Sequence, residues 1–182
     1  MTPPQLPINI PNILTLIRIL LTPLFVISLL RGTYGFALFL FAIAAVSDAL
    51  DGLLARWLNQ RTLLGAYLDP IADKLLIAVS YITLAMKGVV PEWLTVLVIS
   101  RDVLILVGIL VFQMMVIELQ IRPSIVSKCT TAVQLFTILV ILLSPPALVL
   151  TPLYWITAGL TIASGLHYVY VGMNALSESS EE

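Results

Sequence analysis

The chain is poor in charge, in cysteine and in histidine. Only 10% of its 182 residues are charged, 60% are hydrophobic, and the mean hydropathy is +1.08. Soluble domains carry about 25% charged and about 45–50% apolar residues, so the composition predicts a membrane protein. One cysteine, Cys129, and one histidine, His167, exclude an internal disulfide and a mechanism that needs two histidines. A net charge of -1 without a basic tract argues against a nucleic-acid partner.

Six apolar runs approach the length of a membrane-spanning helix, which needs about 20 mostly apolar residues. Glycine and proline fall in the gaps between them. The runs cover approximately residues 13–30, 35–55, 71–86, 94–116, 125–143 and 153–173. We therefore predict an all-α, polytopic integral membrane protein with six transmembrane helices in a single domain, residues 1–182.

The two ends of the chain and the basic residues predict an orientation. Residues 1–12 lack the features of a signal peptide, so we expect the first run to be a retained anchor. Residues 174–182 are polar and acidic, and we expect them to be disordered. Cytoplasmic loops are enriched in Lys and Arg, and this rule predicts cytoplasmic termini. The cytoplasmic set is Arg56, Arg61, Lys74, Arg122 and Lys128, against Arg31 and Lys87 on the other side. The expected location is the bacterial inner membrane or an equivalent membrane.

Four aspartates stand out within residues 47–74. Asp48 and Asp51 are spaced i, i+3, and Asp69 and Asp73 are spaced i, i+4, so each pair shares a helix face. Pro70 suits the first turn of a helix. An aspartate at the centre of a membrane helix costs about 2.5–3.5 kcal/mol, and four carboxylates also repel one another. Mg²⁺ or Mn²⁺ would compensate, because hard cations prefer carboxylate oxygens. The alternative is a charge network that only marks the membrane boundary.

These residues carry a resemblance to a known family. The pattern Asp48-x2-Asp51-Gly52-x2-Ala55-Arg56-x8-Gly65-x3-Asp69-x3-Asp73 resembles the complete motif of the CDP-alcohol phosphatidyltransferases. The resemblance implies six membrane helices, often as a homodimer, with an active site near the cytoplasmic face. It also implies two divalent cations, Mg²⁺ or Mn²⁺, held by the four aspartates, with Asp73 as the general base. The positions implied to line the CDP-lipid site are Gly52, Ala55, Arg56 and Gly65.

Other segments bear on the acceptor. Residues 10–18 resemble the first span of the branch that makes phosphatidylglycerol phosphate or cardiolipin, with Asn12 and Thr15 near the nucleotide. Residues 99–103, 123–128 and 132–135 resemble eukaryotic-type cardiolipin synthases. This implies transfer from CDP-diacylglycerol to phosphatidylglycerol, giving cardiolipin and CMP; glycerol 3-phosphate is the alternative acceptor. The residues expected at the acceptor are Arg101, Lys128 and Arg122, and Arg122 could instead be a loop anchor.

Two further interpretations stay open at this stage. A transporter could use the aspartates as an ion or proton relay, but transporters often contain repeats and this sequence shows no matching second half. Arg18 could belong to the site or could pair with an acid for structural reasons. We assign no chemistry to His167 or Cys129.

Overall fold

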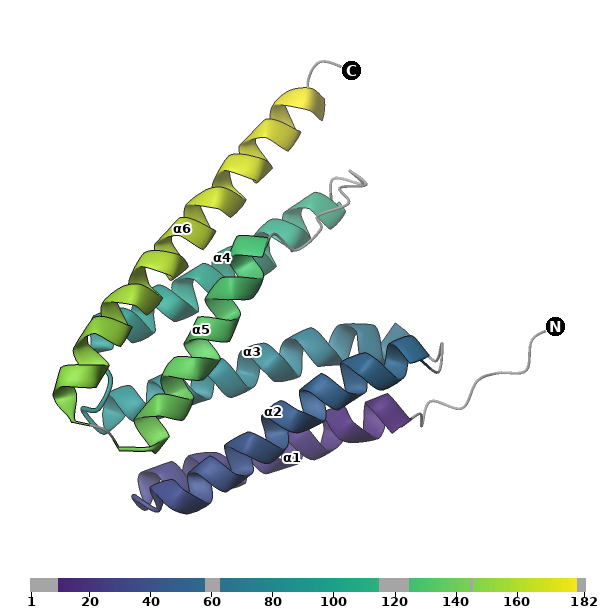
Figure 1. Cartoon of the computed structure of the whole chain (residues 1–182). Coiled ribbons are helices and arrows are strands. Elements are labelled where there is room, and N and C mark those ends of the chain that lie inside the picture. Colours follow the sequence, from purple (N-terminus) through teal and green to yellow (C-terminus); the bar gives the residue numbers. More distant parts are fainter. Residues whose placement is uncertain (1–9, 58–62, 115–124, 145, 180–182) are drawn as a thin grey trace. The chain divides into compact units, whose positions relative to one another are not determined.

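The computed structural model contains six α-helices (Figure 1). It describes the backbone of residues 10–57, 63–114, 125–144 and 146–179, and the side chains of residues 15–47, 72, 74–108, 125–144 and 146–174. The helices are α1 (Ile10–Leu30), α2 (Tyr34–Trp57), α3 (Leu63–Met86), α4 (Glu92–Met114), α5 (Ile125–Leu142) and α6 (Ala147–Ser179). Over these described residues, the predicted all-α fold with six helices is confirmed.

Two helices are longer than the sequence predicts. α3 begins at Leu63, eight residues before the predicted start, so Pro70 lies inside the helix and its placement in a first turn is wrong. α6 runs from Ala147 to Ser179, beyond both ends of the predicted run 153–173. Residues 174–179 are therefore helical rather than disordered. Their alanine and leucine favour a helix, and neither glycine nor proline interrupts the segment.

The chain forms two compact units. The first contains residues Met1–Lys87 and Leu142–Ser144, and the second contains Gly88–Ile141 and Pro145–Glu182. In the first unit α1 packs against both α2 and α3. Among the described side chains of this unit, the largest that are fully buried are Arg18, Tyr81, Phe25, Leu29 and Ile77.

A glycine turn reverses the chain between α1 and α2. Gly32 has a φ of 74°, a left-handed conformation that glycine adopts without a Cβ clash. The Gly32 N–H donates to the Leu29 carbonyl, and the Thr33 N–H donates to the Ser28 carbonyl, both at 3.0 Å. These two bonds form a Schellman motif, which satisfies carbonyls at the end of α1.

Lys87 joins the end of α3 to the end of α1. Its Nζ donates to the Leu29 carbonyl at 3.0 Å and to the Leu30 carbonyl at 2.9 Å. The same ammonium lies 6.0 Å from the ring centroid of Tyr34. A cation at a helix C-terminus is also favoured by the helix dipole. Because the ends of α1 and α3 meet here, these two helices run parallel.

In the second unit α4 packs against α6, and polar side chains join α5 to α6. The joining contacts are Thr130 Oγ1 to the Leu160 carbonyl at 3.1 Å, Gln134 Nε2 to Thr161 Oγ1 at 3.2 Å, and Thr137 Oγ1 to Thr157 Oγ1 at 2.8 Å. Buried hydroxyls of this kind hold apolar helices together where the hydrophobic effect cannot, at roughly 0.6 kcal/mol each.

Aromatic side chains gather where α4 and α6 begin. The rings of Trp93 and Trp155 lie 5.1 Å apart, and both side chains are partly exposed. The Tyr154 hydroxyl donates to the Val89 carbonyl at 2.9 Å. Tryptophan and tyrosine are enriched at membrane–water interfaces, so this end of the unit has the composition of an interfacial belt.

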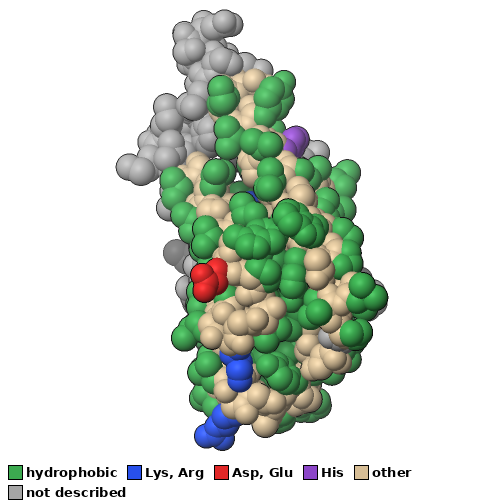
Figure 2. All heavy atoms as spheres, turned by 90° about the vertical axis from the view of Figure 1, so that its left-hand side faces the viewer, with side chains coloured by type: hydrophobic (Ala, Val, Ile, Leu, Met, Phe, Trp, Pro, Cys, Tyr) green, Lys and Arg blue, Asp and Glu red, His purple; other side chains and the backbone are tan. Residues whose placement is uncertain are grey.

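Two described helices are long and apolar enough to cross a membrane. They are Ile125–Leu142, with a mean hydropathy of 1.9, and Ala147–Asn174, with a mean hydropathy of 1.5. Only 33% of the first and 28% of the most apolar 18 residues of the second are buried. A core helix of a soluble protein would be mostly buried, so these low fractions favour contact with lipid. Hydrophobic side chains dominate the face shown in Figure 2. Shorter apolar stretches occur in α1, α2 and α3.

Candidate functional site

The acidic motif occupies the ends of two consecutive helices in the first unit. Asp48, Asp51, Gly52, Ala55 and Arg56 lie in the last turns of α2, and Gly65, Asp69 and Asp73 lie in the first turns of α3. The predicted helical spacing of both acidic pairs is therefore confirmed. Five residues link the two helices, which limits the separation of their ends to roughly 20 Å.

An aromatic contact fixes the register of α1 against α2. The rings of Phe25 and Phe41 lie 5.9 Å apart, so these two positions are level to within about one turn across the antiparallel pair. Each helix rises about 1.5 Å per residue. Ten residues back from Phe25 is Thr15, and ten residues forward from Phe41 is Asp51. Thr15 is therefore within about one turn of the level of Asp51.

The Lys87 contact fixes the register of α1 against α3 in the same way. Leu29 is level with Lys87, and fourteen residues back along each parallel helix are Thr15 and Asp73. The reach of a lysine side chain widens this match to about one turn. The Thr15 side chain is fully buried. α1, α2 and α3 thus bring Thr15, Asp51 and Asp73 to within about one turn of a common level.

The side chains of several predicted site residues lie outside the described part of the chain. They belong to Asn12, Asp48, Asp51, Ala55, Arg56, Asp69 and Asp73, and the surroundings of Gly52 and Gly65 lie outside it as well. Metal binding by the four aspartates is therefore still a prediction. The donor set fits a hard dication, because all four side chains supply carboxylate oxygens from adjoining helix ends.

The predicted acceptor residue Arg101 is buried in the second unit, on α4. Its Nη1 donates to Asp102 Oδ1 at 2.6 Å, and its Nη2 donates to Ser127 Oγ at 2.6 Å. Ser164 Oγ accepts from Nε at 3.2 Å and from Nη2 at 2.9 Å. Arg101 is 4% exposed and Asp102 is 7% exposed. A buried ion pair in an apolar helix is costly, and its members usually serve a function.

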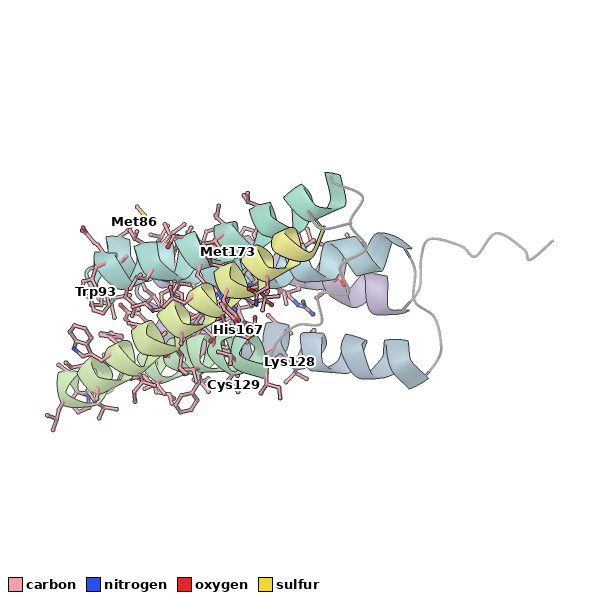
Figure 3. The ribbon with its side chains drawn as sticks, turned by 90° about the horizontal axis from the view of Figure 1, so that it is seen from above. Met86, Trp93, Lys128, Cys129, His167 and Met173 are labelled. Carbon is pink, nitrogen blue, oxygen red and sulfur yellow. The ribbon has the colours of Figure 1, made fainter. Side chains whose placement is uncertain are left out.

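Of the other two predicted acceptor residues, the structure describes Lys128 but not Arg122. Lys128 follows Ser127 at the start of α5, and its side chain is exposed (Figure 3). Ser127, the residue before Lys128, accepts a hydrogen bond from Arg101, so the start of α5 contacts the buried Arg101–Asp102 pair. Arg122 lies outside the described residues.

A groove of about 220 Å³ runs beside Arg101, between α4 and α6. Its walls are mostly apolar, and they include Leu97, Leu104, Ile162 and Leu166. Ligand pockets usually measure about 300–1,000 Å³, so this groove suits part of an apolar molecule rather than a whole one.

Comparison with known proteins identifies the family. The model of the family CDP-alcohol phosphatidyltransferase matches residues 8–163. The chain belongs to the CDP-alcohol phosphatidyltransferase family. The match spans both units, from the start of α1 to within α6.

Several family members are similar over most of the chain. The human cardiolipin synthase (CMP-forming) is 34% identical over 91% of this chain and 62% of its own length. A CDP-diacylglycerol–glycerol-3-phosphate 3-phosphatidyltransferase of Pseudomonas fluorescens is 36% identical over 87% of this chain and 84% of its own. The Bacillus subtilis transferase of the same name is 31% identical, over 94% and 99%. The chain thus spans less than two thirds of the human protein.

The structure draws attention to Arg18, whose role the sequence left open, and to Ser164, which the sequence did not place in the site. Arg18 on α1 is fully buried, and Ser164 on α6 holds the Arg101 guanidinium. Ser164 has one sequence signal, because it continues the polar positions Thr157 and Thr161 along an apolar helix. That pattern indicates a helix contact, but it does not indicate which residue is contacted.

Proposed function

We propose that the protein is a CDP-diacylglycerol-dependent phosphatidyltransferase of phospholipid biosynthesis that makes cardiolipin and CMP. One observation carries the proposal: a chain of this family places the complete eight-residue motif on the adjoining ends of α2 and α3. Chains of this family are named for transfer from a CDP-linked alcohol, and the donor proposed here is CDP-diacylglycerol.

The proposed reaction is a displacement at phosphorus. Asp73 accepts the proton of the acceptor hydroxyl, whose oxygen forms a bond to the phosphorus next to diacylglycerol. The bond from that phosphorus to the bridging oxygen breaks, and CMP leaves with this oxygen. A carboxylate base needs only hydrogen-bond reach of the hydroxyl, and Asp73 is within about one turn of the level of Asp51.

Asp48, Asp51, Asp69 and Asp73 would hold two divalent cations, Mg²⁺ or Mn²⁺. When bound, such ions neutralise the diphosphate and the leaving oxygen. Asn12, Thr15, Gly52, Ala55, Arg56 and Gly65 would surround the CDP part of the donor. The burial of Thr15 at the level of Asp51 and Asp73 supports its place in this set.

The proposed acceptor is phosphatidylglycerol, with Arg101, Lys128 and Arg122 toward its phosphate. The apolar groove beside Arg101 supports a lipid acceptor, because an acyl chain needs apolar walls. Glycerol 3-phosphate is the second candidate, since the Pseudomonas and Bacillus proteins are named for that acceptor.

All six helices are proposed to span the membrane. Their lengths of 18 to 33 residues support this, because 18 residues extend about 27 Å and the hydrocarbon core is about 30 Å thick. Six spans place both termini on one side, which the positions of the basic residues make the cytoplasmic side. A homodimer is proposed from family resemblance.

Product identification tests the proposal. Purified protein receives CDP-diacylglycerol and Mg²⁺ or Mn²⁺, with phosphatidylglycerol and glycerol 3-phosphate in separate reactions, and lipids are analysed by mass spectrometry. We expect cardiolipin and CMP in the first reaction. If only the second reaction gives a product, phosphatidylglycerol phosphate, then the acceptor is glycerol 3-phosphate and not phosphatidylglycerol. If neither reaction releases CMP, the protein is not this enzyme, and a transporter or another role is favoured.

A further inference from the structure

Arg18 is the only arginine or lysine among the described side chains that is fully buried within the first unit. It lies on α1, three residues after Thr15 and therefore on the same helix face. Its exposure is 0%, although a long charged side chain usually reaches water. Removing a guanidinium from water costs several kcal/mol unless an opposite charge compensates it.

Within the first unit, the sequence limits which acids can supply that opposite charge. Residues 1–87 contain four acids, and they are Asp48, Asp51, Asp69 and Asp73. Residues 142–144, which complete the unit, contain none. Every carboxylate of the unit thus belongs to the motif.

The register of α1 and α2 favours one of the four. Seven residues back from Phe25 is Arg18, and seven residues forward from Phe41 is Asp48. Since both helices rise about 1.5 Å per residue, Asp48 is the acid nearest the level of Arg18. Asp51 and Asp73 are each about one turn away, at the level of Thr15.

We infer that Arg18 is the internal counter-charge of the aspartate cluster and a positioning residue for Asp48. The inference rests on the proposed function only in taking the aspartates as the metal site. Four carboxylates in an apolar environment repel one another, and one guanidinium among them lowers that repulsion. Arginine suits the task because its planar fork binds a carboxylate through two N–H groups and stays charged.

This role makes Arg18 and a divalent cation alternatives for neutralising the same carboxylates. By linkage, loss of one cation strengthens binding of the other. A residue that only fills space would not show this coupling. The measurement is the thermal unfolding midpoint of the purified protein, without divalent metal and across a Mn²⁺ titration.

The variants are Arg18→Gln, Arg18→Lys and the matched control Arg31→Gln, which removes an exposed arginine next to the end of α1. We expect Arg18→Gln to lower the metal-free midpoint by on the order of 10 °C. Mn²⁺ should restore more stability to it than to the unaltered protein, with a half-saturating concentration on the order of tenfold lower. Arg18→Lys and Arg31→Gln should respond to Mn²⁺ as the unaltered protein does.

Equal Mn²⁺ responses in Arg18→Gln and Arg31→Gln would overturn the inference. If Arg18→Gln does not fold, adding Asp48→Asn should recover folded protein, because it removes the uncompensated charge; failure to recover would also overturn it. The thermal measurement needs no turnover. Absence of CMP release by the unaltered protein would therefore reject the proposed function without deciding the role of Arg18.

Discussion

The Ser164 hydroxyl accepts two hydrogen bonds from the Arg101 guanidinium, from Nε at 3.2 Å and from Nη2 at 2.9 Å. The two residues are 63 positions apart, and both are buried. Ser127 and Asp102 bind the rest of the same guanidinium. Arg101 is thus held on three sides, and its orientation is fixed before any ligand arrives.

Replacing Arg101 tests its proposed contact with the acceptor. We expect Arg101→Ala to raise the acceptor KM by about tenfold or more, because a charge-assisted hydrogen bond contributes roughly 1.5–3 kcal/mol. The KM for CDP-diacylglycerol should stay within about twofold. Initial rates of CMP release at varied acceptor and donor measure both constants. A larger effect on the donor KM would remove Arg101 from the acceptor site.

Arg101→Ala also leaves Asp102 buried without its cation, which costs on the order of 3–5 kcal/mol of stability. Arg101→Lys is the companion variant, because it keeps the charge and loses the fork. We expect it to fold with an acceptor KM between those of the unaltered protein and Arg101→Ala.

Ser164→Ala removes the hydroxyl that orients Arg101 while leaving its charge. We expect a severalfold rise in the acceptor KM and a loss of about 1–3 kcal/mol of stability, since two N–H groups lose their acceptor. The control is Thr157→Val on the same helix, which deletes a buried hydroxyl that bonds α5 and not Arg101. Kinetics of both variants are compared. A rise in acceptor KM of the same size in the control would show that the effect comes from helix packing in general.

Asp73→Asn keeps the shape of the side chain and removes its basicity. A positioned general base contributes roughly 10²–10⁴-fold to rate, so we expect a loss of this size in kcat. Binding of CDP-diacylglycerol, measured by calorimetry, should persist. Activity equal to that of the unaltered protein would reject Asp73 as the base.

Gly32 and Gly35 form a matched pair for testing the α1–α2 turn. Gly32→Ala places a Cβ at a φ of 74°, and we expect a loss of about 1–2 kcal/mol. At Gly35 nothing lies within 4 Å of an added Cβ, and the residue is helical. Gly35→Ala should therefore be neutral or stabilising by up to about 1 kcal/mol. Thermal unfolding measures the stability of both variants. If Gly32→Ala and Gly35→Ala lose equal stability, the left-handed conformation at Gly32 does not require glycine.

Sequence patterns predicted the helices where apolar runs are long and uninterrupted. The predicted starts of α2 and α5 agree with the structure to within one residue. The pattern failed for α3, because Gly65, Asp69 and Pro70 interrupt the apolar run while the backbone stays helical through them. It failed for α6 at both ends, where Pro152 and the polar tail suggested boundaries that the helix continues across.

The family and its motif were readable from the sequence, because local spacing alone places Asp48 with Asp51 and Asp69 with Asp73 on shared helix faces. Only the tertiary structure decided which positions of other helices lie near their level. The level of Thr15 with Asp51 depends on the contact of Phe25 with Phe41, and the support of Arg101 by Ser164 depends on the packing of α4 against α6. Such contacts join residues far apart in the chain, and no periodicity within one segment encodes the register between two helices.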